Sequence, residues 1–175
     1  LHTLGDIDIS GTVKTAAGGS GAQGGGWGLR AENINISGTV IKAAGGDSSN
    51  NLGGCAMDAN ENINISGTVK SAVGGSGSRA ANAGIAASYG DIVISGVVES
   101  TVGGDAVKMR AGDGIYLGHG NLLITETGAV KLAVGGDGGH SANGINGAVG
   151  NAVICSQGDI TIHGSLTAVG GNTVN

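Results

Sequence analysis

Few residues in this chain have the types and spacing that catalysis needs. A Gly-x-Gly-x-x-Gly string runs from Gly19 to Gly24, but more glycine follows it instead of a helix whose N-terminus could hold a pyrophosphate. The histidines are scattered and have no repeated carboxylate or nucleophile beside them: His2, His119, His140 and His163. We therefore expect no catalytic residue, no bound cofactor and no enzyme activity.

Aspartate and asparagine recur at two positions where calcium binding is the chemistry to consider. Asp47, Asp105 and Asp137 each follow a Gly-Gly pair directly. A second set precedes a repeated apolar segment: Asp6, Asn33, Asn62, Asp91, Asn121 and Asp159. Calcium takes roughly six to eight oxygen ligands, whereas Asx side chains at corners bond to nearby backbone groups and stacked amides form ladders. Corner residues are the main interpretation, and a calcium site is the alternative.

These positions belong to a tandem repeat that fills the chain. GDIDISGTV at 5–13, ENINISGTV at 32–40 and 61–69, and GDIVISGVV at 90–98 are close copies, and two more divergent copies begin at 120 and 158. The glycine that closes each copy recurs at steps of 27, 29, 29, 32 and 36 residues: Gly11, Gly38, Gly67, Gly96, Gly128 and Gly164. Six copies therefore organise residues 1–175 as a single domain.

Each copy predicts three short strands. The Ile-x-Ile segment has the period of two that is typical of a strand with one buried face. A second strand follows the closing glycine and ends at Gly-Gly. Its inward residues are expected in two columns: Val13, Val40, Val69, Val98, Val130 and Leu166, then Ala17, Ala44, Val73, Val102, Val134 and Val169. The third strand is expected to turn these pairs inward: Trp27/Leu29, Cys55/Met57, Ile85/Ala87, Ile115/Leu117 and Val153/Cys155.

A parallel β-solenoid is the fold that these features predict. It would be an all-β rod of about six triangular coils of three short strands, with a repeat of about 29 residues. No window has the i, i+3, i+4, i+7 apolar spacing of a helix, and glycine weakens helices by about 1 kcal/mol per residue. The general rule for parallel crossovers predicts right-handed winding. Three coils, roughly 14 Å, would separate Cys55 from Cys155, which is too far for a disulfide.

Composition and charge exclude several classes of protein. Hydrophobic residues make up 39% and charged residues 12% of the chain, the opposite of a disordered composition. The net charge of −5 argues against nucleic acid as a partner. The chain lacks the run of roughly 18 apolar residues that a membrane span needs.

The repeated Gly-Asp-Ile-x-Ile-Ser-Gly-x-Val segment followed by Gly-Gly resembles the Gly-rich parallel β-helix repeats of bacterial cell-surface proteins, including carbohydrate-binding ones. The likeness covers nearly the whole chain. It implies an extracellular or cell-surface location and binding of a polysaccharide of the polyuronate type, with or without calcium. The chain departs from a sugar binder in having few aromatic platforms, namely Tyr89, Tyr116 and Trp27, and no repeated acidic cluster.

The two ends of the repeat series lead to the main functional expectation. A solenoid coil without a cap exposes apolar stacks and unpaired N–H and C=O groups. The first and last copies show no capping segment and read as complementary parts of one coil. A head-to-tail contact of this kind does not close on itself and propagates into a filament. The expected polymerisation interface comprises Leu1, Leu4, Ile7, Ile9, Ile162, Leu166, Val169 and Val174.

We therefore expect a structural subunit of an extracellular filament or matrix fibre, with identical subunits as partners. Small residues expected on the exterior of the second and third strands favour lateral bundling of such fibres: Ala16, Ala43, Ala72, Ala133, Gly28, Ala56 and Ala86. The alternative is a carbohydrate-binding module excerpted from a longer, capped adhesin.

Overall fold

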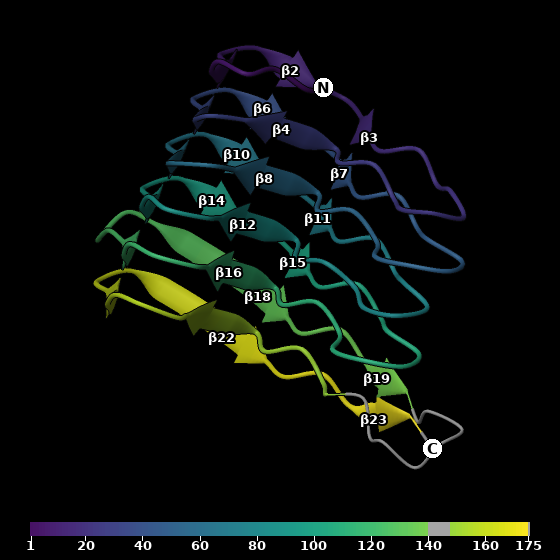
Figure 1. Cartoon of the computed structure of the whole chain (residues 1–175). Coiled ribbons are helices and arrows are strands. Elements are labelled where there is room, and N and C mark those ends of the chain that lie inside the picture. The colour runs from purple at the N-terminus through teal and green to yellow at the C-terminus, as the bar shows by residue number, and fades with distance from the viewer. Residues whose placement is uncertain (140–147, 175) are drawn as a thin grey trace.

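The computed structural model describes residues 1–139 and 148–174 and confirms the predicted parallel β-solenoid (Figure 1). The chain winds as a triangular coil with one parallel sheet on each side. The purple N-terminal coil and the yellow C-terminal coil lie at opposite ends of the rod (Figure 1). Each coil in between lies next to the copies that precede and follow it in the sequence.

The first sheet is built from the Ile-x-Ile segments, whose two apolar residues face the interior in most coils. Its strands follow in chain order: β1 (Ile7–Ile9), β5 (Ile34–Ile36), β9 (Ile63–Ile65), β13 (Ile92–Ile94), β17 (Leu122–Ile124) and β21 (Ile160–Ile162). The residue before each strand lies 27, 29, 29, 30 and 38 positions from its counterpart in the next coil. About four turns thus keep the predicted repeat of about 29 residues, and the last step is longer.

The second sheet corrects one part of the prediction. In the first four coils this side is broken by a bend into two strands: β2 (Thr12–Val13) and β3 (Ala16–Ala17), β6 (Thr39–Val40) and β7 (Ala43–Ala44), β10 (Thr68–Val69) and β11 (Ala72–Val73), β14 (Val97–Val98) and β15 (Thr101–Val102). The last two sides are the continuous β18 (Ala129–Val134) and β22 (Ser165–Val169).

The bend resets the alternation of side chains along this side. The predicted valine column is buried from Val40 to Val130. Up to Val130 the next inward residue is three positions further on, not four, and Val169 in the last coil is 49% exposed, so the second predicted column from Ala17 to Val169 is wrong. The buried positions are instead Ala16, Ala43, Ala72, Thr101 and Ala133. The four alanines among them, expected on the exterior, therefore cannot supply a surface for lateral bundling.

The third sheet corrects the register of the early coils. Its strands are β4 (Leu29–Ala31), β8 (Met57–Ala59), β12 (Ile85–Ala87), β16 (Ile115–Leu117) and β20 (Val153–Cys155). Leu29 and Met57 align with Ile85, so Trp27 and Cys55 precede the strands instead of pointing into the core. Cys155 does lie inward, paired with Leu117. Gly28, Ala56 and Ala86 are also buried and offer no exposed bundling face.

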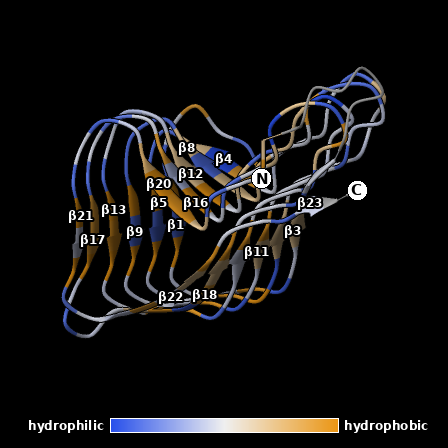
Figure 2. Cartoon of the chain, turned by 90° about the horizontal axis from the view of Figure 1, so that it is seen from below, coloured by the Kyte–Doolittle hydropathy of each residue, from blue (hydrophilic) through white to orange (hydrophobic). Residues whose placement is uncertain are grey.

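An arm projects from the corner between the second and third sheets (Figure 2). In each coil an outgoing limb starts at the Gly-Gly pair and a returning limb leads to the third sheet. The limbs are linked by backbone hydrogen bonds that alternate from one limb to the other along the rod, such as Gly46 N to Gly26 O at 2.8 Å, Gly54 N to Gly46 O at 2.9 Å and Gly75 N to Gly54 O at 2.7 Å. Near the last coil β19 (Gly138–Gly139) pairs with β23 (Thr173–Val174) on the arm.

Apolar side chains of all three sheets meet inside the triangle, where they stack coil upon coil. Leu29, Ile34, Met57, Ile63 and Ile85 are among the fully buried large residues. Figure 2 shows orange, hydrophobic segments in the strands around the interior, interrupted by blue, hydrophilic residues in strands such as β4, β5 and β9. Aliphatic stacks therefore supply the core that the chain, with three aromatic residues of the Trp and Tyr types, could not build from rings.

Candidate functional site

A ladder of Asx side chains lines the corner before the first sheet, as the main interpretation of that column predicted. Asp6 Oδ1 accepts the Asn33 backbone N–H at 3.2 Å and its Nδ2–H at 2.8 Å. Asn33 Oδ1 accepts the same two groups of Asn62 at 3.1 and 3.0 Å. The pattern of backbone bonds continues to Asp159 N, which donates to Asn121 Oδ1 at 3.0 Å. Each side chain thereby fixes the corner of the following coil.

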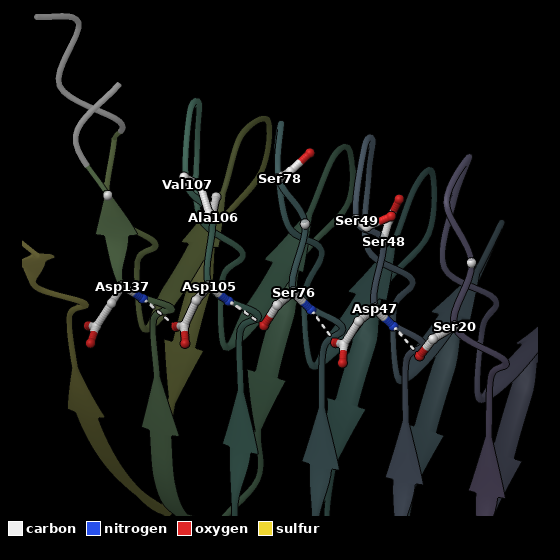
Figure 3. Close-up of a pocket in the computed structure, with 13 residues that line it drawn as sticks. Ser20, Asp47, Ser48, Ser49, Ser76, Ser78, Asp105, Ala106, Val107 and Asp137 are labelled. Carbon is white, nitrogen blue, oxygen red and sulfur yellow. Dashed lines mark hydrogen bonds between the residues drawn. The ribbon is translucent and has the colours of Figure 1, made fainter. Parts of the chain in front are cut away.

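A second ladder runs under the arm and contains the calcium candidates (Figure 3). Ser20, Asp47, Ser76, Asp105 and Asp137 point to the same side, and each of the first four accepts the backbone N–H of the next member at 2.8 to 3.3 Å. Asp137 Oδ1 accepts the backbone N–H of Asn172 at 2.7 Å. They border a shallow trough of about 1010 Å³. Within the described ranges, no three His, Cys, Asp or Glu side chains come together as a metal site would require. The oxygens seen here serve as caps for backbone N–H groups.

The predicted polymerisation residues lie at opposite ends of the rod, and the structure does not bring them together within one chain. Residues 1–3 form an edge beside β4, with a parallel bridge from His2 to Arg30. Leu1 and Leu4 are 63% and 92% exposed, and Ile7 is half-buried while Ile9 is buried. At the other end Ile162 is 44% and Val169 49% exposed, with Leu166 half-buried. The side chain of Val174 lies outside the described residues.

A polar groove of about 340 Å³ lies between the outer face of the third sheet and the returning limbs of the arm. Small side chains form the floor of the groove. Ala86 of β12 and Ala83 of the limb before it are buried, and Cys55 joins them in one apolar cluster. Trp27 lines the groove on the side of the first coil, and Tyr116 of β16 on the side of the fourth. Small residues in one coil, flanked by rings in others, create the hollow.

Two arginine–aspartate pairs lie at the groove, and three of their members, Asp58, Arg110 and Asp113, line it. Arg30 Nε lies 3.6 Å from Asp58 Oδ2, and the Arg30 guanidinium also covers the Trp27 ring at 3.8 Å from its centre. Arg110 Nη2 donates to Asp113 Oδ1 at 2.8 Å. One carboxylate therefore faces each guanidinium, and the two pairs carry no net charge.

Burial changes the acidity of two groups on the groove wall. Desolvation raises the pKa of the Asp58 carboxyl, and the positive charge of Arg30 lowers it in part. Desolvation, followed by the negative charge of Asp58, raises the pKa of the Cys55 thiol to about 12. The thiol is therefore protonated at neutral pH and serves as an apolar part of the wall.

Sequence reasoning missed this groove. Its members come from four different coils, and the residue type at an aligned position changes from one coil to the next, so no motif marks them. A weak signal was available in the aligned column Arg30, Asp58, Ala86, Tyr116, because an outward column that changes from charged to small to aromatic is not a ladder.

Comparisons with known proteins identify no relative: no family model matches the chain, and neither curated proteins nor solved structures gave a match. Among the described residues there is no helix long and apolar enough to cross a membrane. The structure defines the class as a parallel β-solenoid with tandem repeats.

Proposed function

We propose that the chain is a structural segment of an extracellular fibre in which identical solenoids stack head to tail. The extracellular setting follows from the likeness of the repeat to Gly-rich β-helix repeats of bacterial cell-surface proteins. The role itself is non-catalytic and mechanical: a rod that lengthens by adding coils. The polymerisation interface comprises the residues named above, from Leu1 to Ile9 on one face and from Ile162 to Val174 on the other.

The observation that carries the proposal is the uniform way in which each coil templates the next. From β1 to β21, parallel pairing keeps the same residues of each first-sheet strand in register, coil after coil. In the first sheet, a strand at the end of the rod thus presents the same kind of N–H and C=O groups as a covered strand. A second copy placed on it would form contacts of the kind already made five times in the first sheet.

The corner ladder makes the joint testable. Within the chain no two aspartates are adjacent in this column, since Asp91 lies between Asn62 and Asn121. A head-to-tail joint would bring Asp6 of one copy onto Asp159 of another. Two stacked carboxylates repel each other, so the joint would be weaker than an internal step.

Asp6→Asn should therefore promote assembly. We expect this variant to form rods longer than one subunit at a concentration several-fold below that of the wild type, measured by sedimentation velocity and negative-stain microscopy. Asp8→Asn is the matched control, because it removes the same charge from an exposed ladder residue that would follow Thr161 across the joint. Ile7→Lys should prevent elongation. Single short rods for both the wild type and Asp6→Asn, at all concentrations, would refute the proposal.

Polysaccharide binding is the second candidate, and the groove is the observation that favours it. No described feature favours the calcium-dependent, polyuronate form in particular. The chemistry of the groove instead points to a different kind of sugar.

A further inference from the structure

We propose that the groove between the third sheet and the arm is a binding site for a neutral disaccharide. The inference rests on the groove alone and is independent of whether the chain polymerises. Its volume of about 340 Å³ lies at the lower end of the range for small-ligand sites, which is roughly 300 to 1,000 Å³.

The two aspartates of the groove differ in whether their carboxylate oxygens already accept hydrogen bonds from the protein. Asp113 is 2% exposed, and its Oδ1 accepts hydrogen bonds from Arg110 at 2.8 Å and from the Asn151 backbone and side chain at 2.8 and 3.2 Å. It therefore acts as an anchor for Arg110 and the neighbouring limb. Asp58 accepts no hydrogen bond from any described residue and lies only 3.6 Å from Arg30.

Asp58 is consequently the acceptor that a ligand would satisfy. Its side chain is 19% exposed, so water reaches it poorly, and a partly desolvated carboxylate without donors is costly. A pair of sugar hydroxyls would donate to its two oxygens. Across the groove, Arg110 uses one Nη2–H for Asp113, and its side chain is 44% exposed, which leaves N–H groups for the ring or hydroxyl oxygens of a sugar.

The rings of the groove suit the apolar faces of a pyranose. Trp27 is 37% exposed and offers the part of its ring that the Arg30 guanidinium does not cover, and Tyr116 packs on the alanine floor. Strands β4 and β16 are three steps apart in the third sheet, which separates these residues by roughly 14 Å along the rod. That length accommodates a disaccharide lying along the rod axis, with Ala83 and Ala86 below it.

Charge decides between neutral and ionic ligands. The groove is lined by Asp58, Asp113 and Arg110, and Arg30, the partner of Asp58, lies outside the lining, so each carboxylate has one guanidinium group beside it. A uronate would be repelled by Asp58 and would have to share Arg110 with Asp113, and an amine would be repelled by Arg110. A neutral, hydroxyl-rich ligand is not repelled by either charge, and its hydroxyl groups can form hydrogen bonds with carboxylates and guanidinium groups alike.

Titration calorimetry with cellobiose, maltose and lactose tests the site on the full chain. We expect saturable binding of at least one of them and weaker binding of digalacturonate, with or without calcium. Asp58→Asn, which keeps the shape but loses half of the acceptor capacity, should raise the Kd about tenfold. Trp27→Ala should raise it about fivefold.

Tyr89→Ala is the matched control, because Tyr89 is 67% exposed, stacks on His119 at 5.5 Å and lies outside the groove. Its Kd should equal that of the wild type within about twofold. Circular dichroism verifies that each variant keeps its β-structure. The proposal is overturned if no neutral disaccharide binds, if digalacturonate or an amino sugar binds more tightly, or if Asp58→Asn and Trp27→Ala bind like the wild type.

Discussion

The triangular body, formed by the three sheets, and the neck of the arm, where the glycines of the outgoing and returning limbs are hydrogen-bonded to each other, are both built by stacking coils. They are stabilised by opposite means. In the body, side chains such as Ile34, Ile63 and Ile92 fill the interior and the backbones stay apart on three sides. In the neck, glycines of the two limbs approach so closely that backbone bonds to backbone, and at most positions there is no room for a side chain. The same repeat thus contains one region that depends on side-chain volume and one that depends on its absence.

The neck forms a single chain of alternating hydrogen bonds. It runs from Gly26 and Gly19 through Gly46, Gly54 and Gly75, and it continues to Gly171 N, which donates to Gly150 O at 3.0 Å. At most positions a Cβ would overlap a carbonyl oxygen of the neighbouring coil. The one member that is not glycine, Asn82, donates its N–H to Gly75 O over 3.5 Å, the longest bond of the series. The neck therefore tolerates a side chain only where it opens.

Among these variants, Gly75→Ala should lower the unfolding free energy most, although it adds only one methyl group. A methyl group at Gly75 would overlap the carbonyl oxygen and carbon of Gly46, and the stacked limbs cannot separate without breaking bonds on both sides. We expect a loss of unfolding free energy of about 3 kcal/mol or more, or failure to fold. Urea denaturation followed by circular dichroism measures it.

Gly24→Ala is the matched control on the same arm, since nothing lies within 4 Å of a Cβ there. It should be neutral or stabilise by up to about 1 kcal/mol, because alanine restricts the unfolded chain. Equal behaviour of the two variants would mean that the neck is not close-packed and would remove the contrast with the body.

Ile63→Val tests the body in the opposite direction by removing one methylene from a fully buried stack. The cavity is small and the neighbouring isoleucines relax around it, so we expect a loss of about 1 kcal/mol. The measurement is the same urea titration, with Asn64→Ala on the exposed face of β9 as a reference for changes outside the core. A loss as large as that of Gly75→Ala would show that the body is no more tolerant than the neck.

The same contrast explains how much the sequence could predict. The strands of the first sheet and the ladder from Asp6 to Asp159 follow directly from a strict period of two beside an Asx corner. The prediction misaligned the third sheet in the early coils. Cys55 and Met57 are two residues apart, as are Met57 and Ala59, so either pair fits a strand, and the variable length of the preceding loop does not decide between them. The second column, from Ala17 onward, failed at a bend that no residue type marks.

The neck and the groove could be predicted less well than the body. Gly-Gly pairs mark the outgoing limb, but only the structure shows that glycines of the returning limb, such as Gly26 and Gly54, complete one hydrogen-bonded series with them. The groove depends on single residues in different coils, for which a repeat provides no second instance. Stability is thus encoded in the repeating positions of this chain, and specific chemistry in the positions that break the repeat.

Asp58→Asn, at the groove where body and arm meet, should change the unfolding free energy least among these variants. Burial raises the pKa of Asp58 above its ordinary value of 3.8, so the folded chain binds this proton more tightly than the unfolded chain. That contribution favours folding below pH 3.8 and is lost as the pH rises through the folded-state pKa. At neutral pH the wild type therefore carries a desolvated charge, which asparagine lacks.

We expect Asp58→Asn to be more stable than the wild type at pH 7 by roughly a few tenths of a kcal/mol, a gain limited by the loss of the contact with Arg30. At pH 3 the gain should vanish, because the wild-type carboxyl is then protonated as well. Urea titrations at both pH values measure the difference, with Asp8→Asn on the exposed ladder as the control. A variant less stable at pH 7 than at pH 3, relative to the wild type, would mean that attraction to Arg30 outweighs desolvation, and that the groove is stabilised as an ion pair even when empty of ligand.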